Sequence, residues 1–329
     1  MKLILPVLLL LLFALNIFFG SIHLPMGEVW AALMGSADNE TISFIVVQSR
    51  LPQALTALLC GAALAASGLM MQTVFQNPLA DPSILGVNSG ASLGVAIVML
   101  LLGGSVVTMG TMLSGFLLIV LSAFVGAFVI IVLLLMFANF VRTNLTLLIV
   151  GIMISYVTSS VISLLNYSAT EQGVHSYVMW GLGNFGGVSM KTMPLFATAM
   201  LGCIMWCVLM IKPLNALLLG TNYAENLGIN IRRTRTWILI ATGLVSAIVT
   251  AFCGPISFIG LAVPHMARIV SRTANHRVLL PTTLLLGANL GLLCNWICAL
   301  PTDGTLIPLN VVTPFFGVPV ILYVLLKRK

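Results

Sequence analysis

Charged residues are scarce in this sequence: 6% of its 329 residues are Asp, Glu, Lys or Arg, while 60% are hydrophobic. A soluble domain carries roughly 25% charged residues, so the composition excludes an ordinary soluble fold. Many apolar segments reach the roughly 20 residues that a helix needs to cross the hydrocarbon core. A membrane β-barrel would instead alternate polar and apolar residues in short strands. We therefore expect an all-α membrane protein.

Several enzyme motifs are also absent. The chain has no G-x-x-x-x-G-K-[ST] phosphate loop, so it does not hydrolyse ATP itself, and no H-E-x-x-H zinc-protease motif. One G-x-S-x-G pattern, residues 90–94, would make Ser92 a nucleophile, but that motif needs a strand–turn–helix elbow with an acid and a histidine nearby. Ser92 instead begins an apolar helix, where small residues usually serve close packing. We assign no catalytic residue and keep an intramembrane hydrolase at Ser92 as an alternative.

Cysteine and histidine are too dispersed to indicate a metal site. Two cysteine pairs, Cys203/Cys207 and Cys294/Cys298, share helix faces, but no histidine or carboxylate accompanies them. His265 lies near the end of an apolar segment beside Pro264, where we favour a structural role over a ligand or proton relay. We expect no bound metal, no cofactor held by this chain and no disulfide framework.

Hydropathy predicts about ten spans within one polytopic membrane domain, residues 1–329. The spans are 3–20, 51–75, 84–102, 111–138, 146–166, 192–211, 236–254, 258–271, 281–300 and 311–326. The first run is too long for a typical signal peptide, so we expect it to be retained. Residues 21–49 and 167–191 are long enough to hold short helices on the outer membrane surface.

The basic residues fix the expected orientation. With the N-terminus inside, inner loops hold twelve of the fourteen Lys and Arg residues, leaving Arg50 and Lys191 outside. The positive-inside rule then places both termini in the cytoplasm. The net charge of +7 is explained by these loops, and no basic patch carries interleaved aromatics, so we expect no nucleic-acid partner.

No span centre carries an ionisable residue. A proton- or sodium-coupled carrier needs such groups near the midplane, so the sequence disfavours that mechanism. A pump of this kind must be driven by a separate ATPase on the cytoplasmic side. A passive channel or ion-coupled carrier, working without an ATPase, stays the alternative.

Residues 50–94 closely resemble the signature of permease subunits of bacterial type II ABC importers, the FecCD-type systems for iron–siderophore complexes, haem and vitamin B12. Further matches are "GPISFIGLAVPHMARIV" (254–270), "HRVLLP" (276–281) and "VVTPFFGVPVILYVLL" (311–326). The resemblance covers nearly the whole chain. It implies a bundle like that of the vitamin B12 permease, in the bacterial inner membrane.

The resemblance also implies the partners: a second copy of this chain, two cytoplasmic ATPase subunits that use ATP and Mg, and an external substrate-binding protein. Segment 219–230 resembles the loop that couples the permease to the ATPase. Its candidate coupling residues are Leu219, Gly220, Thr221, Ala224, Glu225, Leu227 and Gly228. Asn144 and Leu145 stand where the family narrows the cytoplasmic end of the pathway, although its members carry small hydroxyl residues there.

Docking of the binding protein is where the chain departs most from the family. Arg50 is retained as a docking candidate. At two further positions where the family resemblance leads us to expect arginine, this sequence has Gln53 and Ala299. We expect Arg50→Glu to lower uptake with little loss of folded protein. For the substrate, we rank iron–siderophore first, haem second and cobalamin third. No single residue of the sequence decides among the three.

The most specific family marker is the turn "QNPLADP". Its residues Asn77, Pro78, Asp81 and Pro82 are expected to form a tight cytoplasmic turn between two spans. Asn77-Pro78 ends one helix, Asp81 is solvated or near a helix N-terminus, and Pro82 fits a first helical turn. The Gly/Ser run at 86–94 is expected to let the next helix pack closely.

Overall fold

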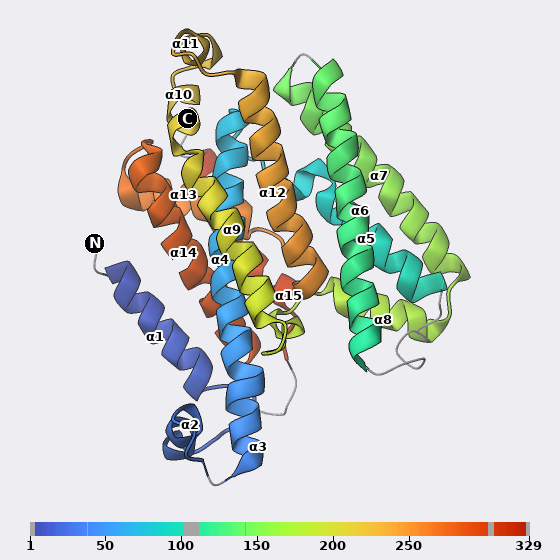
Figure 1. The fold of residues 1–329 in the computed structure, drawn as a ribbon, viewed down its shortest axis with the longest axis vertical. Coiled ribbons are helices and arrows are strands. Elements are labelled where there is room, and N and C mark those ends of the chain that lie inside the picture. The colour runs from blue at the N-terminus through green and yellow to red at the C-terminus, as the bar shows by residue number, and fades with distance from the viewer. Residues whose placement is uncertain (1–3, 38, 102–111, 142, 302–305, 327–329) are drawn as a thin grey trace. The chain divides into compact units, whose positions relative to one another are not determined.

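The computed structural model describes residues 4–37, 39–101, 112–141, 143–301 and 306–326. Within these ranges the secondary structure is helical, with no strand, so the all-α expectation is confirmed. Each of the ten segments expected as spans overlaps a helical segment, with different bounds. They are α1 (Ile4–Phe18), α4 (Leu51–Val74), α5 (Val87–Ala96) continued by the π-helix η3 (Ile97–Leu101), α6 (Met112–Phe140), α7 (Asn144–Ser168), α9 (Met193–Leu209), α12 (Ile231–Cys253), α13 (Ile259–Ser271), α14 (His276–Cys298) and α15 (Leu309–Leu326) (Figure 1).

Five helices in the described ranges are long and apolar enough to cross a membrane. The count becomes six if α9 and α10 (Ile211–Leu217), which meet at a bend of 45°, form one span. The segments 4–18, 87–101, 259–271 and 309–324 are shorter apolar helices. The protein is therefore a multi-pass membrane protein.

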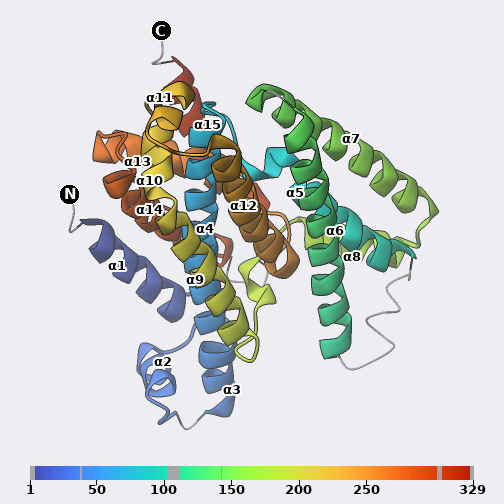
Figure 2. The same cartoon turned by 45° about the horizontal axis from the view of Figure 1, so that its top comes forward.

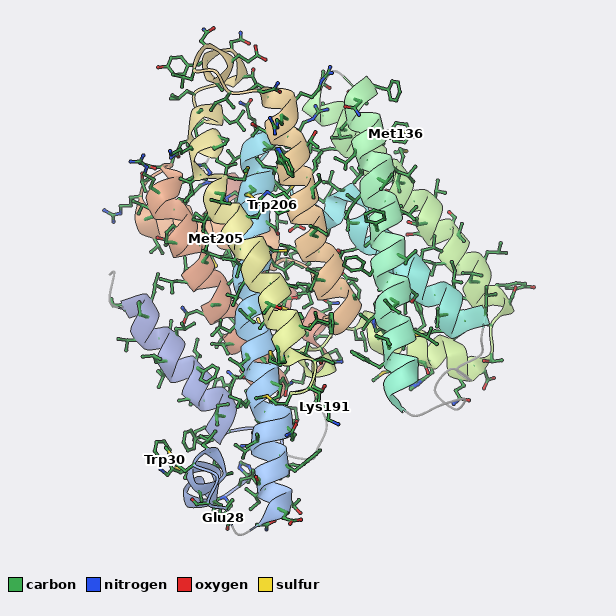
Figure 3. All side chains as sticks on the ribbon, in the orientation of Figure 1. Glu28, Trp30, Met136, Lys191, Met205 and Trp206 are labelled. Carbon is green, nitrogen blue, oxygen red and sulfur yellow. The ribbon has the colours of Figure 1, made fainter. Side chains whose placement is uncertain are left out.

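Short helices occupy the two segments expected on the outer surface. The first holds α2 (Met26–Leu33), α3 (Glu40–Ser43) and the π-helix η1 (Phe44–Arg50), and the second holds α8 (Glu171–Gly181) and the 3-10 helix η5 (Phe185–Gly187). Trp30 of α2 is exposed (Figure 3), a position typical of tryptophan at a membrane–water interface.

The chain, expected as a single domain, divides into two compact units. Unit 1 comprises residues 1–66, 184–204 and 257–329, and unit 2 comprises residues 67–183 and 205–256. Helices α4 and α9 each contribute residues to both units.

Unit 1 is built around close contacts of α14 with α1 and α4. A Cβ atom added to Gly61 would lie 2.2 Å from the carbonyl oxygen of Gly287, so only glycine allows α4 and α14 to approach this closely. On the other side, α1 runs along α14 (Figures 1 and 2). The Nδ2 of Asn295 donates to the Oδ1 of Asn16 at 2.7 Å, a hydrogen bond between apolar helices that strengthens their association.

In unit 2, α5 packs closely on α6, as the Gly/Ser run predicts. A Cβ atom on Gly94 would lie 2.0 Å from the carbonyl oxygen of Ser122, and one on Gly126 would lie 2.1 Å from that of Gly90. Both helices therefore meet backbone to backbone. α12 contacts both of them, and Thr250 shares a 3.1 Å hydrogen bond with Asn88 of α5.

Candidate functional site

The family-signature turn lies in unit 2 between α4 and the 3-10 helix η2 (Pro82–Leu85). The side chain of Asn77 accepts a hydrogen bond from the Leu79 amide at 2.9 Å. Asp81 is the N-cap of η2 and accepts from the Ser83 amide at 2.8 Å. Pro82 takes the first position of η2, where its missing N–H costs nothing.

Asp81 lies near a helix N-terminus, one of its two expected environments, and it is buried rather than solvated. Burial raises the pKa of the Asp81 carboxyl, and hydrogen bonds from the Ser83 amide and hydroxyl oppose that rise. The carboxylate therefore has a local structural partner inside the turn.

The candidate coupling residues surround α11 (Thr221–Asn226) in unit 2. Gly220 and Gly228 have φ values of 101° and 80°, which only glycine adopts without strain. The amide of Gly228 donates to the Glu225 carbonyl at 2.8 Å and closes the helix.

Burial differs among the residues of this short helix and those that flank it. Ala224 is fully buried, while Leu219, Tyr223 and Leu227 are 64%, 52% and 57% exposed. Three large exposed side chains within one short segment are what a docked partner would cover.

At the proposed inner gate, Thr143 caps α7. Its hydroxyl accepts from the Thr146 amide at 3.2 Å, and the two hydroxyls lie 2.7 Å apart. Leu145 is 65% exposed. Asn144 is the first residue of α7, and its side chain lies outside the described part of the chain.

Helix α7 presents a polar face that the sequence reasoning did not identify. Tyr156, Ser160, Ser163 and Tyr167 recur at helical spacing and are all exposed; Tyr156 and Tyr167 reach 67% and 90%. Lipid tails offer no hydrogen-bond partners for such a face. The signal was available as "YVTSSVISLLNYS", a run rich in hydroxyls within a span.

Arg50 is placed differently from a docking arginine on an open surface. Its side chain is buried, and its Nη1 donates to the carbonyl oxygens of Ile17 at 2.9 Å and Phe18 at 3.1 Å. Its Nη2 donates to the carbonyl of Ile22. The guanidinium thus caps the C-terminal end of α1, where a cation is favoured. The expectation that Arg50→Glu leaves folding intact conflicts with this burial.

Arg50 nevertheless borders the hollow that collects the expected docking positions. Arg50, Gln53 and Ala299 line one cavity of about 230 Å³ in unit 1. The structure therefore brings together residues that the sequence relates only through the family resemblance.

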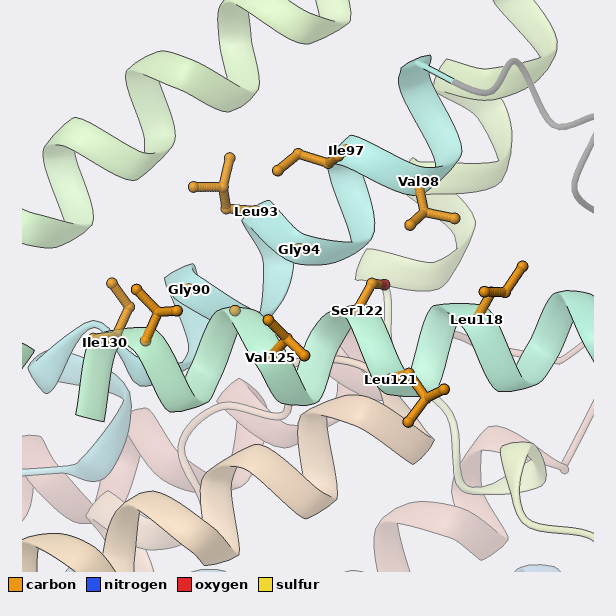
Figure 4. Close-up of a pocket in the computed structure, with 12 residues that line it drawn as sticks. Gly90, Leu93, Gly94, Ile97, Val98, Leu118, Leu121, Ser122, Val125 and Ile130 are labelled. Carbon is orange, nitrogen blue, oxygen red and sulfur yellow. The ribbon is translucent and has the colours of Figure 1, made fainter. Parts of the chain in front are cut away.

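The side chain of Ser92 forms a hydrogen bond with the phenol of Tyr177. Burial raises the pKa of Tyr177, and a hydrogen bond between its side chain and that of Ser92 opposes the rise. The bonded partner of Ser92 is therefore a phenol and not the histidine base that activates a serine nucleophile. The neighbouring hollow between α5 and α6, of about 490 Å³, is lined by Leu93, Ile97, Val125 and other apolar residues (Figure 4).

Metal-binding residues do not gather in the described ranges. No group of three or more His, Cys, Asp or Glu side chains there could hold an ion. All six cysteines lie in the described ranges, where they are buried and form no disulfide, and His265 is buried within α13.

Comparison with known proteins gives one consistent relationship. The FecCD transport family matches residues 8–327. The vitamin B12 import system permease protein BtuC of Klebsiella pneumoniae is 35% identical over 334 aligned residues, covering 99% of this chain and 93% of that protein. BtuC of Salmonella typhi is 36% identical over 301 residues, covering 92% and 89%.

Solved structures agree. A transporter assigned to the metal-chelate type of ABC transporter, in an inward-facing conformation, matches with a TM-score of 0.83 at 28% identity, covering 99% of this chain and 98% of that one. PsaBC of Streptococcus pneumoniae in complex with Fab matches with a TM-score of 0.57 at 13% identity, covering 90% and 94%, and shares the fold alone. This chain therefore belongs to the FecCD transport family and is the permease, rather than the ATP-hydrolysing, subunit of a type II ABC importer.

Proposed function

We propose that this permease imports a bulky metal chelate, with cobalamin as the first candidate, across the bacterial inner membrane into the cytoplasm. The relatives named as vitamin B12 permeases move cobalamin ahead of the iron–siderophores and haem that the sequence alone ranked higher. Two copies of this chain would enclose the pathway. Two ATPase subunits would bind on the cytoplasmic side, and a binding protein would dock on the outer side.

The observation that carries the proposal is the polar face of α7. Serine hydroxyls and tyrosines exposed along a membrane-spanning helix are favoured where the helix borders water or another protein surface. A pathway between two copies of α7 provides such an environment. Leu145, and Asn144 beside it in the sequence, would then stand at the inner end of the pathway and form its cytoplasmic gate.

Coupling to the ATPase is assigned to the loop around α11. Its exposed Leu219, Tyr223 and Leu227 would enter an apolar cleft on the ATPase, while buried Ala224 fixes the helix to the permease. Basic residues in the same inner loops support a cytoplasmic location for this surface and for both termini.

Docking of the binding protein is assigned to the hollow bordered by Arg50, Gln53 and Ala299. Because the guanidinium already donates to three backbone carbonyls, its contribution is to shape and polarise the hollow. A charge-assisted grip of the kind expected from several free arginines would be weaker here.

The test is uptake by vesicles that contain this permease, its ATPase and its binding protein. We expect ATP-dependent accumulation of cyanocobalamin that stops when the ATPase is omitted. Accumulation without the ATPase would favour the channel or carrier alternative. Uptake of a ferric siderophore or haem in preference to cyanocobalamin would replace the substrate while leaving the importer intact.

A further inference from the structure

A second hollow, of about 450 Å³, opens beside α7 in unit 2. Its lining combines serine hydroxyls with apolar side chains and one phenol. The lining residues are Ser83, Ser89, Ser155, Ser159, Ile84, Ile152 and Tyr156. They come from η2, α5 and α7, none is buried, and none carries a charge.

The hollow is held open by a tight contact next to it. Gly86 ends η2 with a φ of 83°, and a Cβ atom there would lie 3.0 Å from the carbonyl oxygen of Gly151. A Cβ atom on Gly151 would in turn lie 2.8 Å from the Cα of Leu85. Glycines thus bring η2 against α7 and fix the distance between the serines on either side.

Two of the serine hydroxyls in this hollow already donate their protons in hydrogen bonds. Ser155 donates to the carbonyl of Gly151 at 3.0 Å, and the Ser83 hydroxyl bonds to the buried, acceptor-only Asp81 carboxylate. A hydroxyl whose proton is committed still offers oxygen lone pairs. These two walls of the hollow therefore present hydrogen-bond acceptors.

We propose that this hydroxyl hollow is a subsite for uncharged, hydrogen-bond-donating arms of the transported chelate, such as primary carboxamides. Amide N–H groups would bond to the serine oxygens, and the carbon stem would lie on Ile84, Ile152 and the Tyr156 ring. A carboxylate arm would meet acceptor oxygens with the Asp81 carboxylate behind Ser83, so it is disfavoured. The volume suits an arm of the chelate and not the whole chelate.

The inference rests on the proposed function because the hollow opens on the α7 face assigned to the pathway. Tyr156 belongs to both surfaces, and Ser159, which lines the hollow, is an exposed residue of the same helix. Lipid chains would leave these hydroxyls without partners, at a cost that a polar ligand avoids.

The test compares two probes in the reconstituted complex: cyanocobalamin, and cyanocobalamin in which carboxamide arms are hydrolysed to carboxylates. The variants are Ser155→Ala and Ser159→Ala, which avoid the Asp81 turn. The control is Thr198→Val on α9, an exposed hydroxyl that likewise donates to its own helix, at 2.8 Å to Pro194. The same binding protein is used throughout, so its own preference cancels between variants.

The wild-type complex is expected to prefer the amide form. Each serine variant should reduce that preference about threefold to tenfold, as expected for one uncharged hydrogen bond, while the control leaves it unchanged. An unchanged preference in active serine variants would overturn the subsite and leave the importer function standing. A wild-type complex that carries no cyanocobalamin would overturn both the subsite and the cobalamin assignment.

Discussion

Arg50 donates from its Nη1 to the carbonyl oxygen of Ile17 at 2.9 Å, and so joins the end of η1, directly before α4, to the end of α1. The neighbouring Gly20 allows the contact, because a Cβ atom there would lie 3.2 Å from the Nε of Arg50. Arg50, which the family resemblance marks for docking, is thus a structural cap within unit 1. Any role of Arg50 in docking operates through the hollow that it borders.

Arg50→Gln should lower the thermal midpoint of the purified permease. The change removes a buried cation that donates to three carbonyls, and such charge-assisted bonds contribute about 1.5–3 kcal/mol each when nothing replaces them. Arg50→Lys should recover only part of the loss, since an ammonium cannot reproduce the forked geometry. Lys191→Gln serves as the control, because Lys191 is the second cation expected on the outer side and is exposed. A midpoint unchanged by Arg50→Gln, with weaker binding-protein affinity, would restore Arg50 as a direct docking contact.

Asp81 should make stability depend on pH in the direction opposite to a salt-bridged carboxylate. Its pKa is raised by burial, so ionisation is less favourable in the folded than in the unfolded chain. The resulting destabilisation grows as pH rises from the unfolded pKa through the folded one. Asp81→Asn keeps an oxygen for the Ser83 amide, so its midpoint relative to wild type should improve as the pH rises above about 4.

The hydrogen bond by which Asp81 caps η2 is tested by a separate substitution. Asp81→Ala removes the acceptor and should cost about 1 kcal/mol. Asn39→Ala removes an exposed cap of α3 that accepts from Thr41 at 3.0 Å, without changing a buried charge. An Asp81→Asn midpoint that follows wild type at every pH would show that the pKa of Asp81 is not raised in the folded chain.

Gly94→Ala should destabilise unit 2 by about 1–3 kcal/mol or more, because the new methyl group would meet the Ser122 carbonyl at 2.0 Å. Gly202→Ala on α9 has open space around the added atom and should leave the midpoint within about 0.5 kcal/mol of wild type. Equal midpoints for the two variants would contradict the close α5–α6 packing. Detergent melting curves of both variants supply the comparison.

Leu227→Asp should separate ATP hydrolysis from uptake. Leu227 is 57% exposed, so the folded permease should tolerate the charge, whereas an apolar ATPase cleft should not. Purified variant should keep its thermal midpoint, lose most ATP-driven uptake and retain less ATPase on size-exclusion chromatography. Arg277→Gln, an exposed residue assigned to the same side of the membrane, is the control. Normal uptake by Leu227→Asp would remove it from the coupling surface.

Much of the fold follows from hydropathy, because a span must be long and apolar to cross a membrane. The turn at Asn77–Pro82 is also readable, since proline and Asx chemistry act locally. Burial of Arg50 could not be read, because its partners Ile17 and Ile22 are more than 25 positions away and are backbone carbonyls of any residue type. The hydroxyl hollow likewise depends on how Gly86 meets Gly151, a distance that no local pattern encodes.

The central claim is that the polar face of α7 lines the substrate pathway. Its most direct test is labelling of Ser163→Cys by a membrane-impermeant thiol reagent, with Leu201→Cys, an exposed apolar position on α9, as the lipid-facing control. The six native cysteines are buried and should react slowly. We predict fast labelling of Ser163→Cys that is slowed by cyanocobalamin during ATP-driven turnover and that blocks uptake. Labelling of Ser163→Cys no faster than Leu201→Cys would contradict the account.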